Sequence, residues 1–161
     1  MSESLPSSVQ RVARALEAAD HPSAIEILGS STHTAQEAAD ALGVEQRQIL
    51  KSMVFRGTPS NRLVVVIVGG HRQVDLARVG EELGEVIKRA DPDWVQQRTG
   101  YPIGGIPPLA HDTPSTVFID REVLGEETLW AGAGSANAMF RTSGTSLALL
   151  TGGVVADVAK R

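Results

Sequence analysis

Two apolar segments that flank a short turn place the strongest constraint on how this chain can fold. Residues 62–68 are rich in β-branched side chains, which predicts a central, buried strand. Residues 49–55 predict a second strand and residues 57–61 a turn, so the two strands should pair antiparallel. The other helical and strand patterns follow one another without strict β-α-β alternation. The sequence therefore predicts an α+β fold with a mixed, mostly antiparallel sheet and a single domain over residues 1–161.

Start and stop signals locate the remaining elements. The clearest signal is the capping box of Thr34 and Glu37, whose helix Gly43 closes. Ser7 or Ser8 can cap a first helix within the N-terminal region, residues 1–22. Other helices are expected at residues 75–83, 91–98 and 143–150, and other strands at residues 24–28, 85–90, 116–120, 128–131 and 138–142.

Composition narrows the classes of function. The 161 residues are 42% hydrophobic and include no cysteine, which excludes disulfides, thiolate catalysis and cysteine zinc sites. The histidines lack metal-ligand spacing, and no glycine loop fits the Walker or dinucleotide pattern, so we expect neither a metal nor a cofactor. The absence of a visible signal peptide or membrane-length apolar run favours a cytoplasmic protein without membrane contact. With a net charge of −4 and no basic block, any nucleic-acid contact should be local.

Lys51 stands out because it lies inside an apolar strand segment. Side chains alternate along a strand, so Lys51 shares a face with Ile49, Met53 and Phe55. A buried ammonium is costly unless a partner or ligand anion meets it, which makes Lys51 a candidate for holding a negative group. The ordinary alternative is a lysine whose amine reaches water at the strand end, and this segment alone favours that alternative.

Two glycine-rich segments can form the rest of a pocket. Residues 99–108 read TGYPIGGIPP, and residues 132–135 read GAGS. Glycine lets a backbone approach a ligand closely, and the final prolines of the first segment fix two φ angles. Each segment alone is an ordinary turn or connector. Both segments together with Lys51 favour a pocket that orients a water or an ester.

Two further positions lie at the ends of expected elements. Asp120 ends a strand and is the best-placed acid. If it approaches the Lys51 amine, it can set the charge and the direction of that lysine. The simpler interpretation is that Asp120 is an ordinary carboxylate at a turn or a helix cap. His33 lies between Thr32 and Thr34 at a helix entrance, where it can line a cleft.

Taken in order, these motifs resemble the YbaK/EbsC family of aminoacyl-tRNA editing domains, which is related to the editing insert of prolyl-tRNA synthetase and its freestanding homologues. The resemblance covers nearly the whole chain after the first helix. Its matching pieces are Leu42-Gly43 followed by Lys51, Val74-Asp75-Leu76, Asp91-Pro92, Thr99-Gly100-Tyr101, residues 104–108, Phe118-Ile119-Asp120 and residues 132–135. The ordered set is specific, whereas any one piece is not.

The resemblance implies a small α+β domain with a curved mixed sheet flanked by helices. It implies hydrolysis of the ester that joins a wrong amino acid to the 3′ end of tRNA, with the aminoacyl-tRNA 3′ end as partner and a synthetase partner left open. Lys51 takes the place of the family's essential lysine, and Thr34 a place that helps choose the substrate. We therefore expect catalytic roles for Lys51, Gly104 and Asp120. The expected substrate-binding residues are Thr32, His33, Thr34, Thr99, Gly100, Tyr101, Gly105, Ile106, Pro107, Pro108, Gly132, Gly134 and Ser135.

This chemistry suits the residues present. An aminoacyl ester is already activated, so a positioned water, a polarised carbonyl and the nearby 2′-hydroxyl can suffice. Lys51 would contact the terminal phosphate or ribose, or stabilise negative charge that develops on the ester. A general-base role would require its pKa to fall far below about 10.4.

Departures from the family pattern leave the amino-acid specificity open. Pro107 stands where relatives often carry serine, and residues 132–135 lack the Lys-Arg pair of some relatives. Two alternatives therefore remain: a non-catalytic module that binds tRNA or a synthetase, and a pocket for a nucleotide or an aminoacyl-adenylate. The sequence indicates no oligomeric state.

Overall fold

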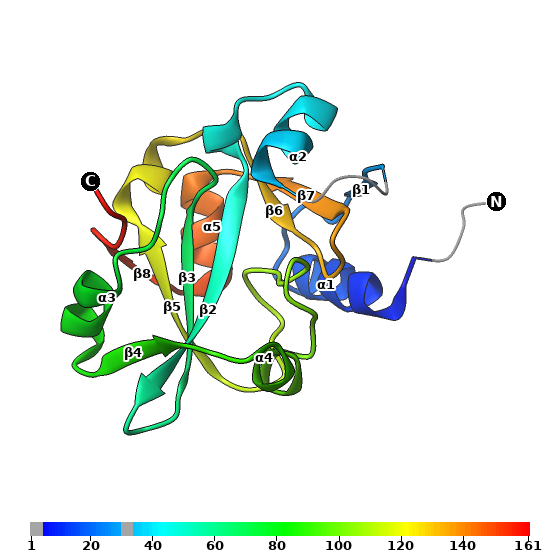
Figure 1. Ribbon diagram of the computed structural model, residues 1–161. Coiled ribbons are helices and arrows are strands. Elements are labelled where there is room, and N and C mark those ends of the chain that lie inside the picture. The colour runs from blue at the N-terminus through cyan, green and yellow to red at the C-terminus, as the bar shows by residue number, and fades with distance from the viewer. Residues whose placement is uncertain (1–4, 30–33) are drawn as a thin grey trace.

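A computed structural model of the chain describes residues 5–29 and 34–161 (Figure 1). Its centre is a five-stranded sheet with the strand order β4-β2-β3-β5-β8. Strands β4, β2 and β3 pair antiparallel, whereas β3, β5 and β8 pair parallel. The bounds are β2 (Leu50–Thr58), β3 (Leu63–Gly69), β4 (Val86–Arg89), β5 (Ser115–Asp120) and β8 (Val154–Ala156). The predicted antiparallel pair is confirmed, with Lys51 opposite Val68.

A second, three-stranded sheet lies beside the first (Figure 1). It is antiparallel, with the order β1-β7-β6. Its strands are β1 (Ile25–Ile27), β6 (Leu129–Gly132) and β7 (Ala138–Thr142). A single parallel bridge between Ile49 and Trp130 joins the start of β2 to β6. The two sheets therefore meet at one end of β2 and diverge along the rest of it.

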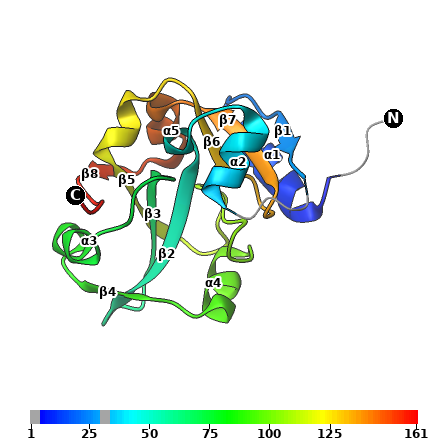
Figure 2. The same cartoon turned by 45° about the horizontal axis from the view of Figure 1, so that its top comes forward.

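The helices cover both sheets. They are α1 (Ser7–Ala18), α2 (Ala35–Leu42), α3 (Leu76–Leu83), α4 (Pro92–Thr99) and α5 (Gly144–Thr151), with short 3-10 turns η1 (Gln46–Gln48) and η2 (Arg121–Gly125). Figure 2 shows α2 in front of β6 and β7, next to one end of β2. The Thr34–Glu37 capping box opens α2 as predicted, and Gly43 ends it in the left-handed conformation.

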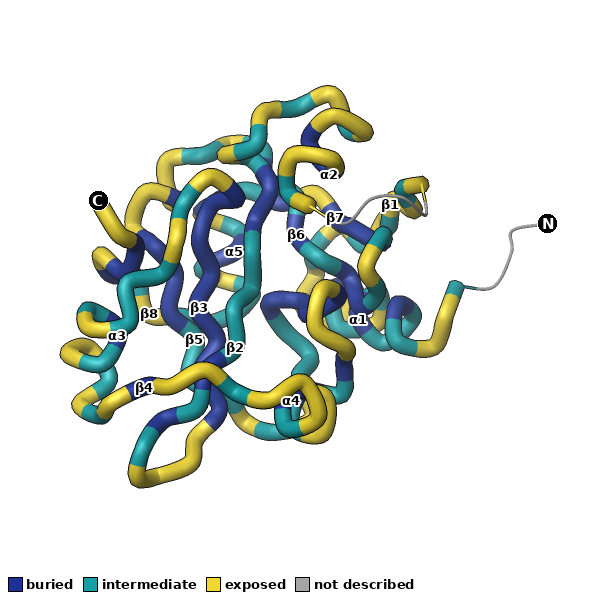
Figure 3. The backbone as a smooth tube through the Cα atoms, viewed as in Figure 1, coloured by how far each residue is buried: buried dark blue, intermediate teal, exposed yellow. Residues whose placement is uncertain are grey.

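Strand β3 is buried along its whole length (Figure 3). Because its side chains alternate, Leu63, Val65 and Ile67 join the apolar core formed with α1, α4 and α5. Val64 and Val66 face the opposite way, into the core covered by α3. A strand buried on both faces explains the continuous β-branched run in the sequence.

Some boundaries differ from the prediction. The α+β class and the mixed sheet are confirmed, but β8 and the division into two sheets were not predicted. The cap of α1 is Pro6, and no side chain caps this helix, so the expected serine cap was wrong. Pro6 is tolerated at this position because the first N–H groups of a helix have no partner inside it, so the missing N–H of proline costs no hydrogen bond. The stripe of Val9, Val12 and Leu16 is buried as expected.

Candidate functional site

A cavity of about 550 Å³ lies along the free edge of β2. Every residue from position 49 to 55 lines it, although neighbouring side chains of a strand point to opposite faces. The cavity must therefore follow the strand's edge. On that edge β4 pairs only with residues 55–58, and the only bridge to β6 is at Ile49, so nothing in the described parts of the chain pairs with β2 in between.

Four segments form the other walls of this edge cavity. The lining comprises Thr34, Ala35 and Ala38 from the start of α2; Arg89, Ala90 and Val95 from the β4–α4 corner; Ile103, Gly104 and Ile106 from the glycine-proline loop; and Gly132, Ser135, Ala136, Ala138 and Met139 from β6, β7 and their connection. Most of these side chains are small or apolar. Within residues 5–29 and 34–161, no Asp, Glu or His lines the cavity.

Lys51 brings a positive charge to the cavity wall. Its side chain is half-buried, and its Nζ donates a hydrogen bond to the main-chain oxygen of Arg72. Burial lowers the pKa of the Lys51 ammonium from its ordinary value. No carboxylate of the described chain forms an ion pair with it. Lys51 is thus a cation held by a neutral carbonyl, with its charge left to act on a ligand.

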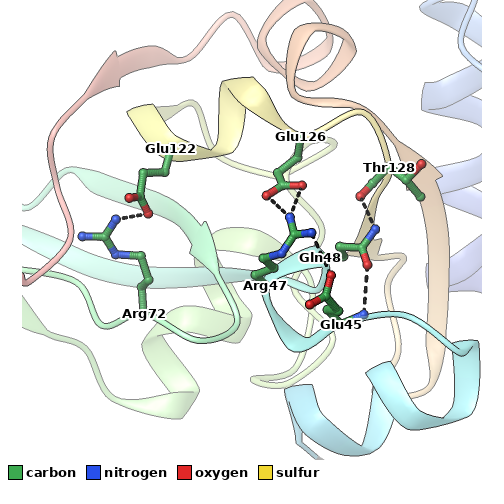
Figure 4. A network of polar contacts seen from close by, with 7 residues as sticks. All are labelled: Glu45, Arg47, Gln48, Arg72, Glu122, Glu126 and Thr128. Carbon is green, nitrogen blue, oxygen red and sulfur yellow. Dashed lines mark hydrogen bonds and ion pairs between the residues drawn. The ribbon is translucent and has the colours of Figure 1, made fainter.

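A second, polar cavity of about 350 Å³ lies next to Arg72. The Arg72 guanidinium forms an ion pair with Glu122, drawn in Figure 4, and donates to the main-chain oxygen of Lys160 at 3.1 Å. Its Nη1 also lies 3.6 Å from Oδ2 of Asp120, which is 2% exposed. Oδ2 has no hydrogen-bond partner, and burial raises the pKa of the Asp120 carboxyl. Asp120 therefore lines the polar cavity rather than the edge cavity.

Neighbouring ion pairs fix the same end of the sheet (Figure 4). Arg47 pairs with Glu126 and, at 2.7 Å, with Glu45. Gln48 donates to the main-chain oxygen of Thr128 at 3.2 Å, just before β6. These contacts tie the segment that leads into β2 to the segment that leads into β6.

The glycine-proline loop packs directly on the loop after β6. A Cβ atom on Gly105 would come within 2.8 Å of the Ser135 backbone, so only glycine allows this approach. Gly104 is exposed with φ +96°, and open space surrounds its Cβ position. The main-chain oxygen of Pro107 lies 2.7 Å from Nε2 of His111. Burial lowers the pKa of His111, so its neutral ring donates to Pro107.

Helix α1 holds the far side of this loop. Nη2 of Arg11 donates to the Ala110 oxygen at 3.1 Å and pairs with Asp112 at 2.5 Å. The Arg11 guanidinium lies 4.8 Å from the centre of the Tyr101 ring. Tyr101 is fully buried, and its hydroxyl donates to Ala110 at 3.0 Å. Side chains outside the edge cavity therefore fix the loop that forms one of its walls.

The edge cavity brings together only part of the site predicted from sequence. It is lined by Lys51, Thr34, Gly104, Ile106, Gly132 and Ser135. The residues that lie outside its lining are Asp120, Thr99, Gly100, Tyr101, Gly105, Pro107, Pro108 and Gly134. Thr32 and His33 fall outside the described residues.

The residues outside the lining support the loops instead. Thr99 is buried and accepts a hydrogen bond from the Tyr101 amide at 3.1 Å. Gly100 ends α4 with φ +85°. Gly134, with φ +102°, packs so closely on α1 that a Cβ would lie 2.6 Å from the Ser8 oxygen. Packing, rather than contact with the cavity, accounts for these positions.

Sequence reasoning missed several lining residues. Ala35 and Ala38 come from one face of α2, and Met139 from β7. The helical spacing of Ala35 and Ala38 is typical of a buried face and gives no sign of a ligand, and Met139 lies within a short apolar strand. Arg89 was missed because a charged residue at a strand end is ordinary.

Comparison with known proteins identifies the family. Residues 29–150 match the model of the aminoacyl-tRNA editing domain. The chain belongs to this family. A solved structure of a candidate trans-editing enzyme for prolyl-tRNA synthetase has 38% identity and a TM-score of 0.92, and the match covers 98% of this chain and 100% of that one. The hypothetical protein APE2540 has 29% identity and a TM-score of 0.87, over 93% of this editing domain and 99% of that chain.

Curated relatives agree with this assignment. The uncharacterized protein YwhH of Bacillus subtilis is 30% identical over 111 residues, which are 68% of this chain and 69% of YwhH. The proline–tRNA ligase of Maridesulfovibrio salexigens is 30% identical over 116 residues, or 71% of this chain and 20% of the ligase. The editing domain thus spans about a fifth of that synthetase. The resemblance drawn from the ordered motifs is confirmed.

Two features of the described residues bear on partners. None of their helices has the length and apolar character needed to cross a bilayer. They also hold no group of three or more His, Asp or Glu side chains placed to bind a metal ion.

Proposed function

We propose that this editing domain hydrolyses the ester between a wrongly attached amino acid and the 3′-terminal ribose of tRNA. The observation that carries the proposal is the half-buried, positively charged residue Lys51 in the lining of a largely apolar cavity. An apolar cavity accepts the uncharged side chain of an amino acid, and a cation beside it favours the charge that develops on the ester oxygen.

In the proposed reaction, water attacks the carbonyl carbon of the ester. The bond between that carbon and the ribose oxygen breaks, the amino acid leaves as its acid, and a proton from the water passes to the ribose oxygen. Because no Asp, Glu or His of the described chain lines the edge cavity, no such side chain is assigned as general base. Catalysis rests on orientation and on charge, with the 2′-hydroxyl of the same ribose close by.

The backbone of the glycine-proline loop supplies the orientation. Gly104 is exposed at the cavity wall, where its main-chain groups can meet the ester. The packing of Gly105 on Ser135 and the hydrogen bond between His111 and Pro107 hold the loop before any substrate arrives. A site fixed in advance loses little free energy in reorganisation.

The test is a deacylation assay with tRNAs that each carry one labelled, wrong amino acid. The protein should accelerate release of at least one amino acid, and Lys51→Ala should lower that rate about 100-fold or more. Lys160→Ala, at an exposed lysine outside both cavities, is the matched control and should retain activity. Rates equal to buffer for every mischarged tRNA would overturn the proposal, and tRNA binding without turnover would favour a non-catalytic module.

A further inference from the structure

The loop between β3 and α3, residues 70–75, holds the Lys51 ammonium through the main-chain oxygen of Arg72. A lysine side chain is long and flexible, so its ammonium stays in one place only if its partner does. His71 and Gln73, on either side of Arg72, are exposed, so burial of side chains does little to fix this part of the loop. The position of the Lys51 ammonium therefore depends on what holds the Arg72 carbonyl.

A segment far away in the sequence, residues 158–160, pairs with this loop. Val74 of the loop and Ala159 form an antiparallel bridge. Two main-chain hydrogen bonds flank the bridge, each 2.8 Å long: from the Asp75 amide to the Val158 oxygen, and from the Lys160 amide to the Gln73 oxygen. The pairing therefore begins at the residue that directly follows Arg72.

The side chain of Arg72 contacts the same segment. Its Nη2 donates to the main-chain oxygen of Lys160 at 3.1 Å, while its Nη1 forms an ion pair with Glu122. The main chain on the C-terminal side of Arg72 is held as well, because the Gln73 oxygen accepts from the Lys160 amide. Segment 158–160 thus holds Arg72 both by its side chain and through the next residue of its main chain.

Burial anchors segment 158–160. Val158 is fully buried and Ala159 is 3% exposed, and both belong to the apolar core that α3 covers. Strand β8 precedes the segment and pairs parallel with β5, where Ala156 is opposite Asp120. The segment therefore has an apolar anchor of its own, and the loop gains that anchor by pairing with it.

We propose that segment 158–160 is a positioning element for Lys51, because it fixes the Arg72 carbonyl that holds the Lys51 ammonium. The inference rests on the proposed function, since it takes Lys51 as the residue that acts on the ester. The match to the model of the editing-domain family ends at residue 150, so the segment lies outside the matched part of the chain. None of its residues lines either cavity. The segment therefore acts through Arg72 and not by contact with a substrate.

The first test compares two substitutions at one position. Lys160→Pro removes the amide hydrogen that is donated to Gln73, whereas Lys160→Ala removes only the exposed side chain and keeps this donor. In the deacylation assay, Lys160→Pro should lower kcat at least about tenfold with little change in KM, because a displaced ammonium stabilises less charge in the transition state. Lys160→Ala should keep both values. Equal kcat for the two variants would overturn the inference.

NMR relaxation of the lysine side chains measures the same effect without a substrate. The chain has only three lysines, Lys51, Lys88 and Lys160, so the Lys51 signal of lysine-labelled protein is easily assigned. The order parameter of the Lys51 side chain should fall in Lys160→Pro and keep its original value in Lys160→Ala. An unchanged value in Lys160→Pro would overturn the inference whether or not tRNA is hydrolysed. A lack of hydrolysis by the wild type, with the expected order parameters, would overturn the proposed function and leave the support of Lys51 in place.

A second pair of variants separates positioning from loss of stability, and it also serves if Lys160→Pro does not fold. Val158→Ala and Val79→Ala remove the same atoms from two fully buried valines of one apolar core. Both should therefore lower the free energy of unfolding by a similar amount. Only Val158 belongs to the segment, so only Val158→Ala should lower the order parameter of Lys51 and kcat. The same changes in Val79→Ala would show that general loosening of the core, rather than segment 158–160, moves Lys51.

Discussion

The ammonium of Lys51 donates a hydrogen bond to the main-chain oxygen of Arg72, which links the two cavities of the protein. Arg72 is in turn held by Glu122 and lies 3.6 Å from the buried carboxylate of Asp120. The direction of the Lys51 side chain therefore depends on a loop that is anchored outside the edge cavity. Asp120 forms no ion pair with the amine, and the cation that it faces is Arg72.

The pH dependence of deacylation should report the charge on Lys51. Burial lowers its pKa, and the proposed role needs the charged form, so protein-dependent hydrolysis should decline as pH rises through that lowered pKa. Rates are measured across neutral to alkaline pH after subtracting hydrolysis in buffer. Lys51→Arg should retain some activity without the decline, because guanidinium does not titrate in this range. The same decline in Lys51→Arg would assign it to another group.

The free energy of unfolding should change with pH in the direction opposite to the deacylation rate. A base whose pKa is lowered by folding binds fewer protons in the folded state than in the unfolded state, whose lysine pKa is about 10.4. In the window between the two pKa values the free energy of unfolding should therefore rise with pH. Denaturant unfolding of the wild type and of Lys51→Met across this window measures the effect, and the Met variant should lack the Lys51 contribution.

Arg72 and Asp120 should be strongly coupled in stability. Arg72→Met leaves the 2%-exposed Asp120 without its cation, which should cost about 3 kcal/mol in the free energy of unfolding at neutral pH. Adding Asp120→Asn removes the uncompensated charge and should recover more than half of that loss. A double-mutant cycle by urea unfolding tests the coupling. Losses that simply add would show that the two side chains act independently.

Thr34 should contribute to stability through its cap as well as to the cavity wall. Its hydroxyl accepts from the Glu37 amide at 3.1 Å, so Thr34→Ala should cost about 1 kcal/mol. Thr34→Ser keeps the oxygen and should cost much less. Thermal and urea unfolding of both variants measure the difference. If both lose the same stability, the methyl group rather than the cap is responsible.

Local patterns made much of the fold predictable. The β-branched run of β3 and the capping box of α2 depend on a few neighbouring residues, and both were confirmed. The parallel pairing of β5 with β3 and with β8 joins segments far apart in the sequence, which no local pattern encodes. Strand β8 spans only Val154–Ala156, too short for a period to be visible.

The candidate site was predictable in type rather than in detail. Lys51 was singled out because burying an ammonium among apolar side chains is costly unless an anion or a partner compensates it. The structure places Lys51 in the lining of the cavity. Tyr101 belongs to the same glycine-proline segment as Gly104, yet it is fully buried beneath the loop. Whether a residue in such a segment supports the loop or contacts a ligand depends on three-dimensional packing. The spacing of residues along the chain does not determine that packing.

Gly105 gives the sharpest test of the contact between the two loops. Its Cβ position lies 2.8 Å from backbone atoms of Ser135, which cannot move aside as a side chain would, so Gly105→Ala should cost about 1–3 kcal/mol and lower deacylation by displacing the loop. Gly125→Ala is the matched control, because nothing lies within 4 Å of its Cβ position. It should change stability by less than about 0.5 kcal/mol. If Gly105→Ala proves as stable and active as the control, the loops need no close contact for the cavity to work.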